Sequence, residues 1–309
     1  MKKGLLSISD LSGKEIESVI EQAVVMKRGD RTGLLSGKVL ALLFEKPSLR
    51  TRVSFEVAMH QLGGHVVYLS QEEVGLGKRE SVCDVARVLS RYVDCIAART
   101  FSYETLDILA QCSSVPVINA LSDLEHPCQA LSDLLTIYEK KGELAGLTLA
   151  FIGDGNNVAN SLLLAASLTG MNFSFASPLG YGISDEMSNR GREFAALSGS
   201  RIRLTNDPFE AVAEADIVYT DVWTSMGQES EGEKRRIAFS GYQVNDRLLS
   251  LAKEDALFMH PLPAHRGEEI ADGLLENSHS VVFDQAENRL HLQKVLLTKL
   301  LLPADSGDK

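Results

Sequence analysis

The sequence has few cysteines, and none of them forms a C-x-x-C pair. Its 309 residues include only Cys83, Cys95, Cys112 and Cys128. The first residues, MKKGLLSISDLSGKE, also lack the apolar run and the small-residue cleavage pattern of a signal peptide. The sequence therefore predicts a cytoplasmic protein with reduced thiols.

Long hydrophobic runs and positively charged surfaces are also missing. No stretch approaches the roughly 18 apolar residues of a membrane-spanning helix, so no membrane partner is expected. The chain has 31 basic and 42 acidic residues, a formal net charge of -11, and no basic stripe interleaved with aromatic residues. A nucleic-acid partner is therefore not expected, and any anion site must be local.

Short apolar runs alternate with helical patterns along the whole chain. The runs that predict strands are residues 38–44, 65–69, 94–98 and 115–119, followed by a second series at 147–157, 172–177, 215–221, 256–261 and 280–284. Such alternation is typical of α/β folds with parallel sheets. The two series predict two doubly wound parallel-sheet domains joined by interdomain helices.

Three segments follow from this division. Residues 1–138 form the first expected domain and residues 139–288 the second, with the polar stretch EKKGELAG as the best linker candidate. A helix is expected to begin near Pro127, because proline suits the first turn. Residues 289–309 are expected to form a C-terminal helix that packs back across the domain junction.

The segment FEKPSLRTRVSFEVA at 44–58 places positive charge at the start of an expected helix. Ser48 can cap this helix, and Arg50 and Arg52 flank Thr51. Arginine is unfavourable at a helix N-terminus unless an anion binds there, because the unpaired N–H groups already make that end positive. The pattern therefore indicates a phosphate-sized pocket. The alternative is a solvated basic turn with a serine cap.

The segment EHPCQAL at 125–131 combines an imidazole with a nearby amide. His126 precedes the proline, and Gln129 follows three residues later on the same side of the helix start. Together they could grip a carbonyl group. The alternative is a surface or interdomain histidine without a catalytic role.

The segment FIGDGNNVAN at 151–160 partly resembles a dinucleotide fingerprint. Gly153 and Gly155 are present, but Val158 stands where the third glycine belongs, which weakens a dehydrogenase interpretation. Amide side chains at the end of a strand could instead hold a zwitterionic ligand. The alternative is that the asparagines only satisfy a tight turn.

The segment DVWTSMGQE at 221–229 follows another expected strand. Asp221 would lie at the strand end, and Ser225, Met226 and Gly227 would form a mobile loop. A carboxylate beside hydroxyl and backbone donors suits the ammonium and carboxylate groups of an amino acid. The alternative is an ordinary long loop.

The segment HPLPAHRGEEI at 260–270 has a proline on each side of Leu262, where a strand is expected to end. Such a turn is rigid and prone to a cis peptide bond. We expect its carbonyl groups to face a ligand.

Together these five segments resemble the aspartate/ornithine carbamoyltransferase family, in the family's order and over nearly the whole chain. The family's phosphate motif, Ser-Thr-Arg-Thr-Arg, corresponds to SLRTR at 48–52, and EHPCQAL carries its His-Pro-x-Gln element. GDGNNVANS and DVWTSMGQE are similar to the ornithine branch, in which Ser225, Met226 and Gly227 would form a closing loop.

The resemblance implies a set of ligand-binding residues. Those for carbamoyl phosphate are Ser48, Leu49 (through its backbone), Arg50, Thr51, Arg99, His126, Gln129, Leu262 and Arg289. Those for ornithine are Asn157, Asp221, Ser225, Met226, Pro261 and Leu262. Arg50, Arg99 and His126 would be catalytic. Arg50 would balance the leaving phosphate, while Arg99 and His126 would donate to the carbamoyl oxygen.

The implied reaction is attack of ornithine's neutral side-chain amine on the carbamoyl carbon, giving citrulline and phosphate without a metal or an organic cofactor. The family implies a homotrimer, or an assembly of trimers, with sites shared between subunits. Arginine metabolism could use the reaction in either direction. The alternatives are a carbamoyltransferase for aspartate, putrescine or an acylated ornithine, a non-catalytic binding protein, and a Rossmann-type oxidoreductase.

Two positions depart from the ornithine branch and are similar to the aspartate branch. Pro261 stands where ornithine enzymes usually have cysteine, and Gly75 where they usually present glutamine to a neighbouring subunit's phosphate. Lys78 or Arg79 could replace that glutamine. Ornithine remains the preferred acceptor, because burying aspartate's second carboxylate against Asp221 would be unfavourable.

Overall fold

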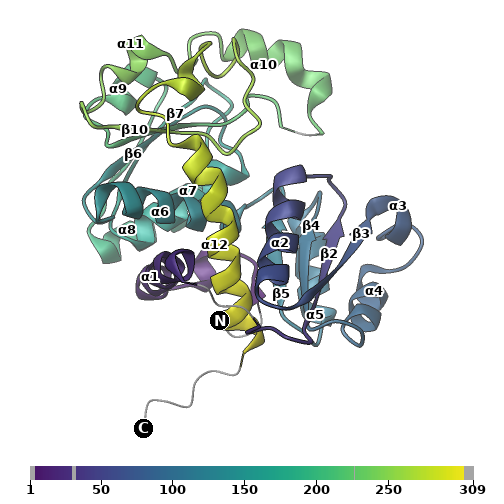
Figure 1. The fold of residues 1–309 in the computed structure, drawn as a ribbon. Coiled ribbons are helices and arrows are strands. Elements are labelled where there is room, and N and C mark those ends of the chain that lie inside the picture. The colour runs from purple at the N-terminus through teal and green to yellow at the C-terminus, as the bar shows by residue number, and fades with distance from the viewer. Residues whose placement is uncertain (1–3, 30–32, 226, 303–309) are drawn as a thin grey trace. The chain divides into compact units, whose positions relative to one another are not determined.

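The computed structural model describes residues 4–29, 33–225 and 227–302. The chain divides into two compact units, residues 1–135 with 287–309, and residues 136–286. Helices α6 (Pro127–Lys141) and α12 (Val282–Leu301) each contain residues of both units (Figure 1). The domain boundaries suggested by the sequence, at 138 and 288, stay a prediction.

The first unit is built on a parallel five-stranded sheet. Its strand order is β1 (Gly4–Leu5), β5 (Val117–Leu121), β4 (Cys95–Arg99), β2 (Val39–Phe44) and β3 (His65–Ser70). Strands β2, β4 and β5 are almost entirely buried, which explains their continuous apolar sequences. Four of these strands lie where the apolar runs predict them. The two-residue β1 is too short for such a pattern.

Capping serines start most helices of the first unit. These helices are α1 (Gly13–Arg28), α2 (Leu49–Gln61), α3 (Gln71–Val74), α4 (Val82–Leu89) and α5 (Tyr103–Cys112), with a 3-10 turn at Ile8–Asp10. Ser48 caps α2 by accepting the N–H of Thr51, and the helix buries Phe55, Ala58 and Met59. Its position is therefore determined by a polar cap at one end and an apolar face along its length.

The second unit repeats the architecture. Its parallel sheet has the order β10 (Leu257–Met259), β9 (Ile217–Thr220), β6 (Thr148–Ile152), β7 (Asn172–Ala176) and β8 (Ile202–Thr205). In Figure 1, α9 (Pro208–Val212) and α11 (Asp246–Leu249) lie on one side of the sheet, and α7 (Asn157–Leu168) and α8 (Asp185–Ser198) on the other. Helix α10 is Gly232–Ala238, and 3-10 turns occur at Glu229–Glu231 and Leu274–Glu276.

The predicted α/β class with two parallel sheets is confirmed. Phe151 stacks on Phe175 and on Tyr219 in the second core, with ring centroids 5.8 and 5.4 Å apart. Across the described residues, no helix combines the length and the apolar composition needed to cross a membrane.

Two predicted elements differ from the structure. The run 280–284 is not a strand: Ser280 forms one bridge with Phe258, and α12 then begins at Val282. A short apolar run fits a buried helix start as well as a strand, and here Val281 and Val282 are buried at that start. The fifth strand is instead β8, and α6 continues to Lys141, into the proposed linker.

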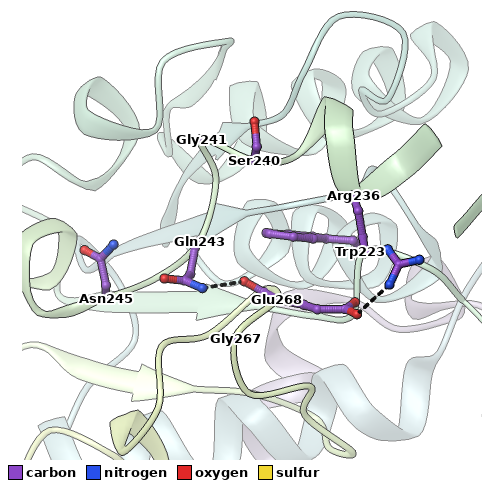
Figure 2. Close-up of a pocket in the computed structure, with 8 residues that line it drawn as sticks. All are labelled: Trp223, Arg236, Ser240, Gly241, Gln243, Asn245, Gly267 and Glu268. Atoms are coloured by element: carbon purple, nitrogen blue, oxygen red, sulfur yellow. Dashed lines mark hydrogen bonds and ion pairs between the residues drawn. The ribbon is translucent and has the colours of Figure 1, made fainter. Parts of the chain in front are cut away.

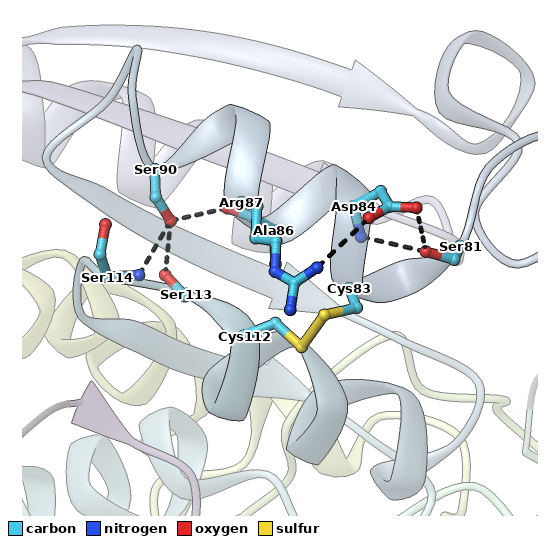
Figure 3. Close-up of a disulfide and its surroundings, with 9 residues drawn as sticks. All are labelled: Ser81, Cys83, Asp84, Ala86, Arg87, Ser90, Cys112, Ser113 and Ser114. Carbon is cyan, nitrogen blue, oxygen red and sulfur yellow. Dashed lines mark hydrogen bonds and ion pairs between the residues drawn. A yellow bond between two sulfur atoms is a disulfide. The ribbon is translucent and has the colours of Figure 1, made fainter.

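The expectation of reduced thiols throughout is wrong. Cys83 of α4 and Cys112 of α5 form a disulfide, with their Cα atoms 5.2 Å apart (Figure 3). Ser90 adds a second tie between the ends of these helices, through Ser113 Oγ at 3.0 Å and the N–H of Ser114 at 3.1 Å. The cysteines are 29 positions apart, so only the packing of α4 on α5 brings them together. Cys95 and Cys128 are free and buried.

We expect reduction of this disulfide to lower the free energy of unfolding by about 3 to 4 kcal/mol, because the crosslink limits the unfolded chain. The prediction uses the separation of 29 residues between Cys83 and Cys112. Urea unfolding with and without dithiothreitol measures the change. A double variant, Cys83→Ser with Cys112→Ser, should match the reduced protein and ignore the reductant. Identical curves for the wild type in both buffers would contradict the prediction.

Candidate functional site

The carboxyl ends of three adjacent strands place most of the phosphate-site candidates at one edge of the first sheet. Strand β4 lies between β2 and β5. The loop after β2 leads to Ser48 and α2, Arg99 is the last residue of β4, and His126 follows β5 at the start of α6. In parallel α/β sheets this edge is where ligands bind.

The N-terminus of α2 is held in place by hydroxyl groups. Ser48 Oγ donates to Thr51 Oγ1 at 3.0 Å, and Arg289 Nη2 donates to the same Thr51 oxygen at 2.7 Å. Thr51 is buried. The resemblance assigns the anion to Arg50, and in the structure Arg52 has other partners. Arg52 bonds Glu56 at 2.8 Å and lies 3.8 Å from the centre of the Tyr68 ring.

Three arginines share the space beside this helix start. Arg99 is 9% exposed, and its Nε has no hydrogen-bond partner among the described residues. Burial, and then the charges of Arg289 and Arg50, lower the pKa of Arg99 to about 10. Buried cations that repel one another are costly unless an anion compensates them. The cluster therefore has the electrostatics of an anion site.

His126 adds a neutral donor to this cluster. Burial lowers its pKa well below the ordinary value of 6.5, and the charges of Arg289 and Arg99 lower it further. Its carbonyl accepts the N–H groups of Gln129 at 3.1 Å and Ala130 at 3.2 Å, so the residue also starts α6. His126 is therefore uncharged at neutral pH and can donate a hydrogen bond without carrying charge.

The amide of Gln129 has a defined orientation. Its Nε2 donates to Asp133 Oδ1 at 2.8 Å, whereas its buried Oε1 has no hydrogen-bond partner among the described residues. The sequence suggests that this amide grips a carbonyl. The structure presents an oxygen instead, which suits an N–H donor of a ligand.

We expect stability to fall as the pH drops below about 6.5, because His126 has a lowered pKa in the folded chain. Below this pH His126 binds a proton in the unfolded chain but not in the folded chain. The free energy of unfolding therefore falls by up to about 1.4 kcal/mol per pH unit. Urea titrations between pH 7.5 and about 5 measure this slope. The His126→Gln variant should have a shallower slope, and His65→Ala, at an exposed position, should not. Equal slopes in all three proteins would contradict the assignment.

The second sheet brings the ornithine candidates to its own carboxyl edge. Strand β9 lies between β6 and β10. Asn157 starts α7 after β6, Asp221 follows β9, and Pro261 and Leu262 follow β10. Residues as far apart in the sequence as Asn157 and Leu262 are therefore brought to the same edge of three neighbouring strands.

Asp221 is a buried carboxylate with fixed oxygens. Asn156 Nδ2 donates to its Oδ2 at 2.8 Å, and the N–H of Val222 donates to its Oδ1 at 2.8 Å. Burial raises its pKa, and His260 opposes this shift. Asn156 was not singled out in the sequence, although it caps α7 and orients Asp221. A bound cation would favour the ionised form of this carboxylate, which burial disfavours.

The expected closing loop is only partly described. The N–H of Ser225 donates to Gln228 Oε1 at 3.3 Å, and Ser225 accepts the N–H of Gln228 at 3.0 Å. Met226 lies outside the described residues. The loop's movement stays a prediction.

Leu262 is held by residues that the sequence analysis missed. Its N–H donates to Nδ1 of the buried His260 at 2.9 Å, and the peptide bond to Pro263 is cis. His260 Nε2 lies 3.3 Å from Glu269 Oε1, and the His260 N–H donates to Gln285 Oε1 at 2.9 Å. In the sequence, the polar run HRGEE after the prolines could have pointed to these residues. The run does not show which of its two glutamates is buried.

Each of the two sheets lies in a segment that matches a known protein family. Residues 3–139 match the family model for the carbamoyl-P binding domain of aspartate/ornithine carbamoyltransferases, and residues 145–300 match the model for their Asp/Orn binding domain. The chain belongs to the aspartate/ornithine carbamoyltransferase family. The resemblance stated from the sequence is therefore confirmed.

Similar proteins match over their full length. The ornithine carbamoyltransferase of Anoxybacillus flavithermus is 53% identical, covering 97% of this chain and 96% of that protein. The ornithine carbamoyltransferase of Archaeoglobus fulgidus is also 53% identical, covering 97% of each. The solved structure of the Pyrococcus furiosus ornithine carbamoyltransferase has a TM-score of 0.94 and 48% identity, and the match covers 99% of this chain and 98% of that one.

The departure at Gly75 has a local structural reason. Gly75 ends α3 with a φ of 58°, and a Cβ built there would lie 2.9 Å from the Cβ of Arg79. Glutamine, expected here in the ornithine branch, would be strained at this backbone conformation. Lys78 and Arg79 are both exposed in the following turn, so either cation is accessible.

Proposed function

We propose that this protein transfers the carbamoyl group of carbamoyl phosphate to the side-chain amine of L-ornithine, giving L-citrulline and phosphate. The observation that carries the proposal is the group formed by half-buried Arg50 with buried Arg99, Arg289 and neutral His126 beside the N-terminus of α2. Arg50, Arg99 and His126 lie in the part of the chain that matches the carbamoyl-P binding model, whereas Arg289 lies in the part that matches the Asp/Orn binding model. The reaction is that of an ornithine carbamoyltransferase.

The phosphate is proposed to bind at the start of α2. Ser48, Thr51 and the backbone N–H of Leu49 would donate to its oxygens, and Arg50 would balance their charge. Burial first, and then repulsion by Arg289 and Arg50, lower the pKa of Arg99, and a bound anion would offset both costs. Anion binding is therefore expected to lower the energetic cost of keeping these arginines close together.

The carbamoyl group has two kinds of polar atom, and the cluster offers a partner for each. Arg99 and the neutral N–H of His126 would donate to the carbamoyl oxygen, which becomes negative in the transition state. The unpartnered Oε1 of Gln129 would accept from the carbamoyl NH2 group. Leu262 is proposed to contact both ligands through its backbone.

Ornithine is proposed to bind at the carboxyl edge of the second sheet. Asp221 would pair with the α-ammonium group, while Asn157, Ser225 and Met226 would hold the remaining polar atoms of the α-amino-acid end. Pro261 would line the same site without the thiol that the ornithine branch usually has there. The side-chain amine is left without a partner in this arrangement, as a nucleophile requires.

The chemical step forms one bond and breaks another. The neutral amine attacks the carbamoyl carbon, the new C–N bond forms, and the C–O bond to phosphate breaks with its electron pair moving to the phosphate. The amine proton passes to a phosphate oxygen. Because a free amine has a pKa of about 10, its deprotonation depends on desolvation in the site. His126, with its lowered pKa, acts as a donor and not as an imidazolium acid.

The assembly and the compartment are part of the proposal. We propose a trimer or an assembly of trimers, in which exposed Lys78 or Arg79 of one subunit reaches the phosphate of the next. We also propose a cytoplasmic location. Light scattering tests the assembly, and cell fractionation tests the location.

The acceptor assay tests the function. Purified protein is given carbamoyl phosphate with ornithine, aspartate, putrescine or N-acetylornithine, each separately, and ureido products are measured. We expect citrulline from ornithine alone, so that Pro261 and Gly75 are tolerated differences. Product from another amine only would mean that these positions mark a changed specificity, and no product from any acceptor would overturn the proposal.

A further inference from the structure

A second cluster of ligand-type atoms lies in the loop after β10, at His265, Glu268 and Glu269. One nitrogen or oxygen from each of the three lies within 4.8 Å of the others. His265 Nδ1 is 3.8 Å from Glu268 Oε2 and 3.8 Å from Glu269 Oε2. The proposed function assigns no role to this group.

One oxygen of the cluster is buried without a partner. The Glu269 side chain is fully buried, and its Oε1 accepts the N–H of His265 and faces His260 Nε2 at 3.3 Å. Its Oε2 has no hydrogen-bond partner among the described residues. This oxygen faces the imidazole of His265. A buried carboxylate oxygen without a hydrogen-bond donor is costly, so a ligand that binds it is favoured.

Within the described part of the chain, neither neighbouring arginine donates to Glu269 Oε2. Arg236 lies 3.8 Å from Glu268 Oε1 but bonds Glu233 at 2.8 Å, and Arg266 bonds Glu276 at 2.7 Å. The cluster itself contributes two carboxylates and one imidazole. A divalent cation would neutralise the two carboxylates more completely than the guanidinium of Arg236, which also bonds Glu233.

An open pocket reaches the cluster from solvent. It has a volume of about 420 Å³, and its lining includes Trp223, Arg236, Gly267 and Glu268. Figure 2 shows the guanidinium of Arg236 beside the Glu268 carboxylate, and the Gln243 amide bonded to the Glu268 backbone oxygen. The pocket gives a hydrated ion a path to the Glu268 carboxylate.

We propose that His265, Glu268 and Glu269 bind a divalent transition metal ion of the zinc type. Imidazole with carboxylates suits Zn²⁺, whereas Mg²⁺ and Ca²⁺ prefer sites made of oxygen ligands. Tetrahedral Zn²⁺ places its ligands about 3.3 Å apart. The two distances of 3.8 Å from His265, and the separation of the two carboxylates within 4.8 Å, must therefore contract on binding. The side chains of His265 and Glu268, at 50% and 32% exposure, have room to move, and Glu269 is the fixed ligand.

Calorimetric titration of the chelator-treated full chain with zinc chloride tests the site, with the Cys83–Cys112 disulfide intact so that those thiols do not compete. We expect one ion per chain, and affinity reduced at least about tenfold in both His265→Ala and Glu268→Gln. Both variants change exposed or half-exposed side chains, so folding should survive. His65→Ala, an exposed histidine in the other unit, should bind like the wild type. Equal affinity in all four proteins, or no binding up to millimolar zinc, would overturn the proposal.

Discussion

Arg50→Ala is expected to lower kcat/KM for carbamoyl phosphate by about 100- to 1000-fold, which corresponds to about 3 to 4 kcal/mol of transition-state stabilisation. Arg50 acts on the buried Arg99, whose pKa it helps to lower, so its charge reaches the anion site. The variant should fold normally, since Arg50 lies in the first turn of α2 and outside the apolar face of that helix. Steady-state kinetics and thermal unfolding measure the two effects separately.

The matched control is two positions away on the same helix turn. Arg52 is exposed, bonded to Glu56 and stacked on Tyr68. Exposed ion pairs contribute about 0 to 1 kcal/mol, so Arg52→Ala should keep nearly wild-type kinetics. If both variants lost activity equally, or if Arg50→Ala kept wild-type kinetics, the phosphate-site assignment would fail and the motif would be a solvated basic turn.

Asp221→Asn is expected to lower kcat/KM for ornithine by about 100-fold, because a charge-assisted contact to the α-ammonium contributes about 3 kcal/mol. The Val222 N–H can still donate to the oxygen of the new amide, while its NH2 group replaces the oxygen that accepts from Asn156. Binding of inorganic phosphate belongs to the first unit and should not change. Kinetics with varied ornithine, together with phosphate titration, measure both effects.

The same variant should lose little stability. Because burial raises the pKa of Asp221, the unfolded carboxyl ionises near its usual 3.8 but the folded one only at higher pH. Ionisation therefore costs the folded state stability as the pH rises, and the cost is fully present at pH 7. Asparagine removes that cost, so the loss should not exceed about 1 kcal/mol for altered hydrogen bonds. Asp272→Asn, at an exposed position, is the control for both readouts. Unchanged ornithine kinetics in Asp221→Asn would refute the assignment.

The strand positions were predictable because buried parallel strands require continuous apolar residues. Strands β2 and β6 lie within the runs at 38–44 and 147–157. The run at 280–284 was wrongly predicted to be a strand, because the buried start of α12 also requires apolar residues. Strand β8, Ile202–Thr205, alternates apolar with charged or polar residues and lacks the continuous apolar run.

The site candidates could be selected from the sequence, but their geometry could not. The chemistry of Ser48, Arg50 and Thr51 follows from their place at a helix start. That Arg52 pairs with Glu56 instead depends on which way each side chain leaves the turn. The contact of Arg289 with Thr51 joins residues 238 positions apart, and no local pattern predicts it.

The sequence by itself determined the fold class, the family and the residue types available for binding an anion and an amino acid, because these follow from periodicity and from motifs in a given order. Only the tertiary structure decided which groups are buried together: the arginines around neutral His126, Asp221 beside Asn156, Glu269 behind His260, and the disulfide between Cys83 and Cys112. The pKa of a side chain and the pairing of two thiols depend on burial and on the distances between segments far apart in the chain. Burial and these distances are set by tertiary packing.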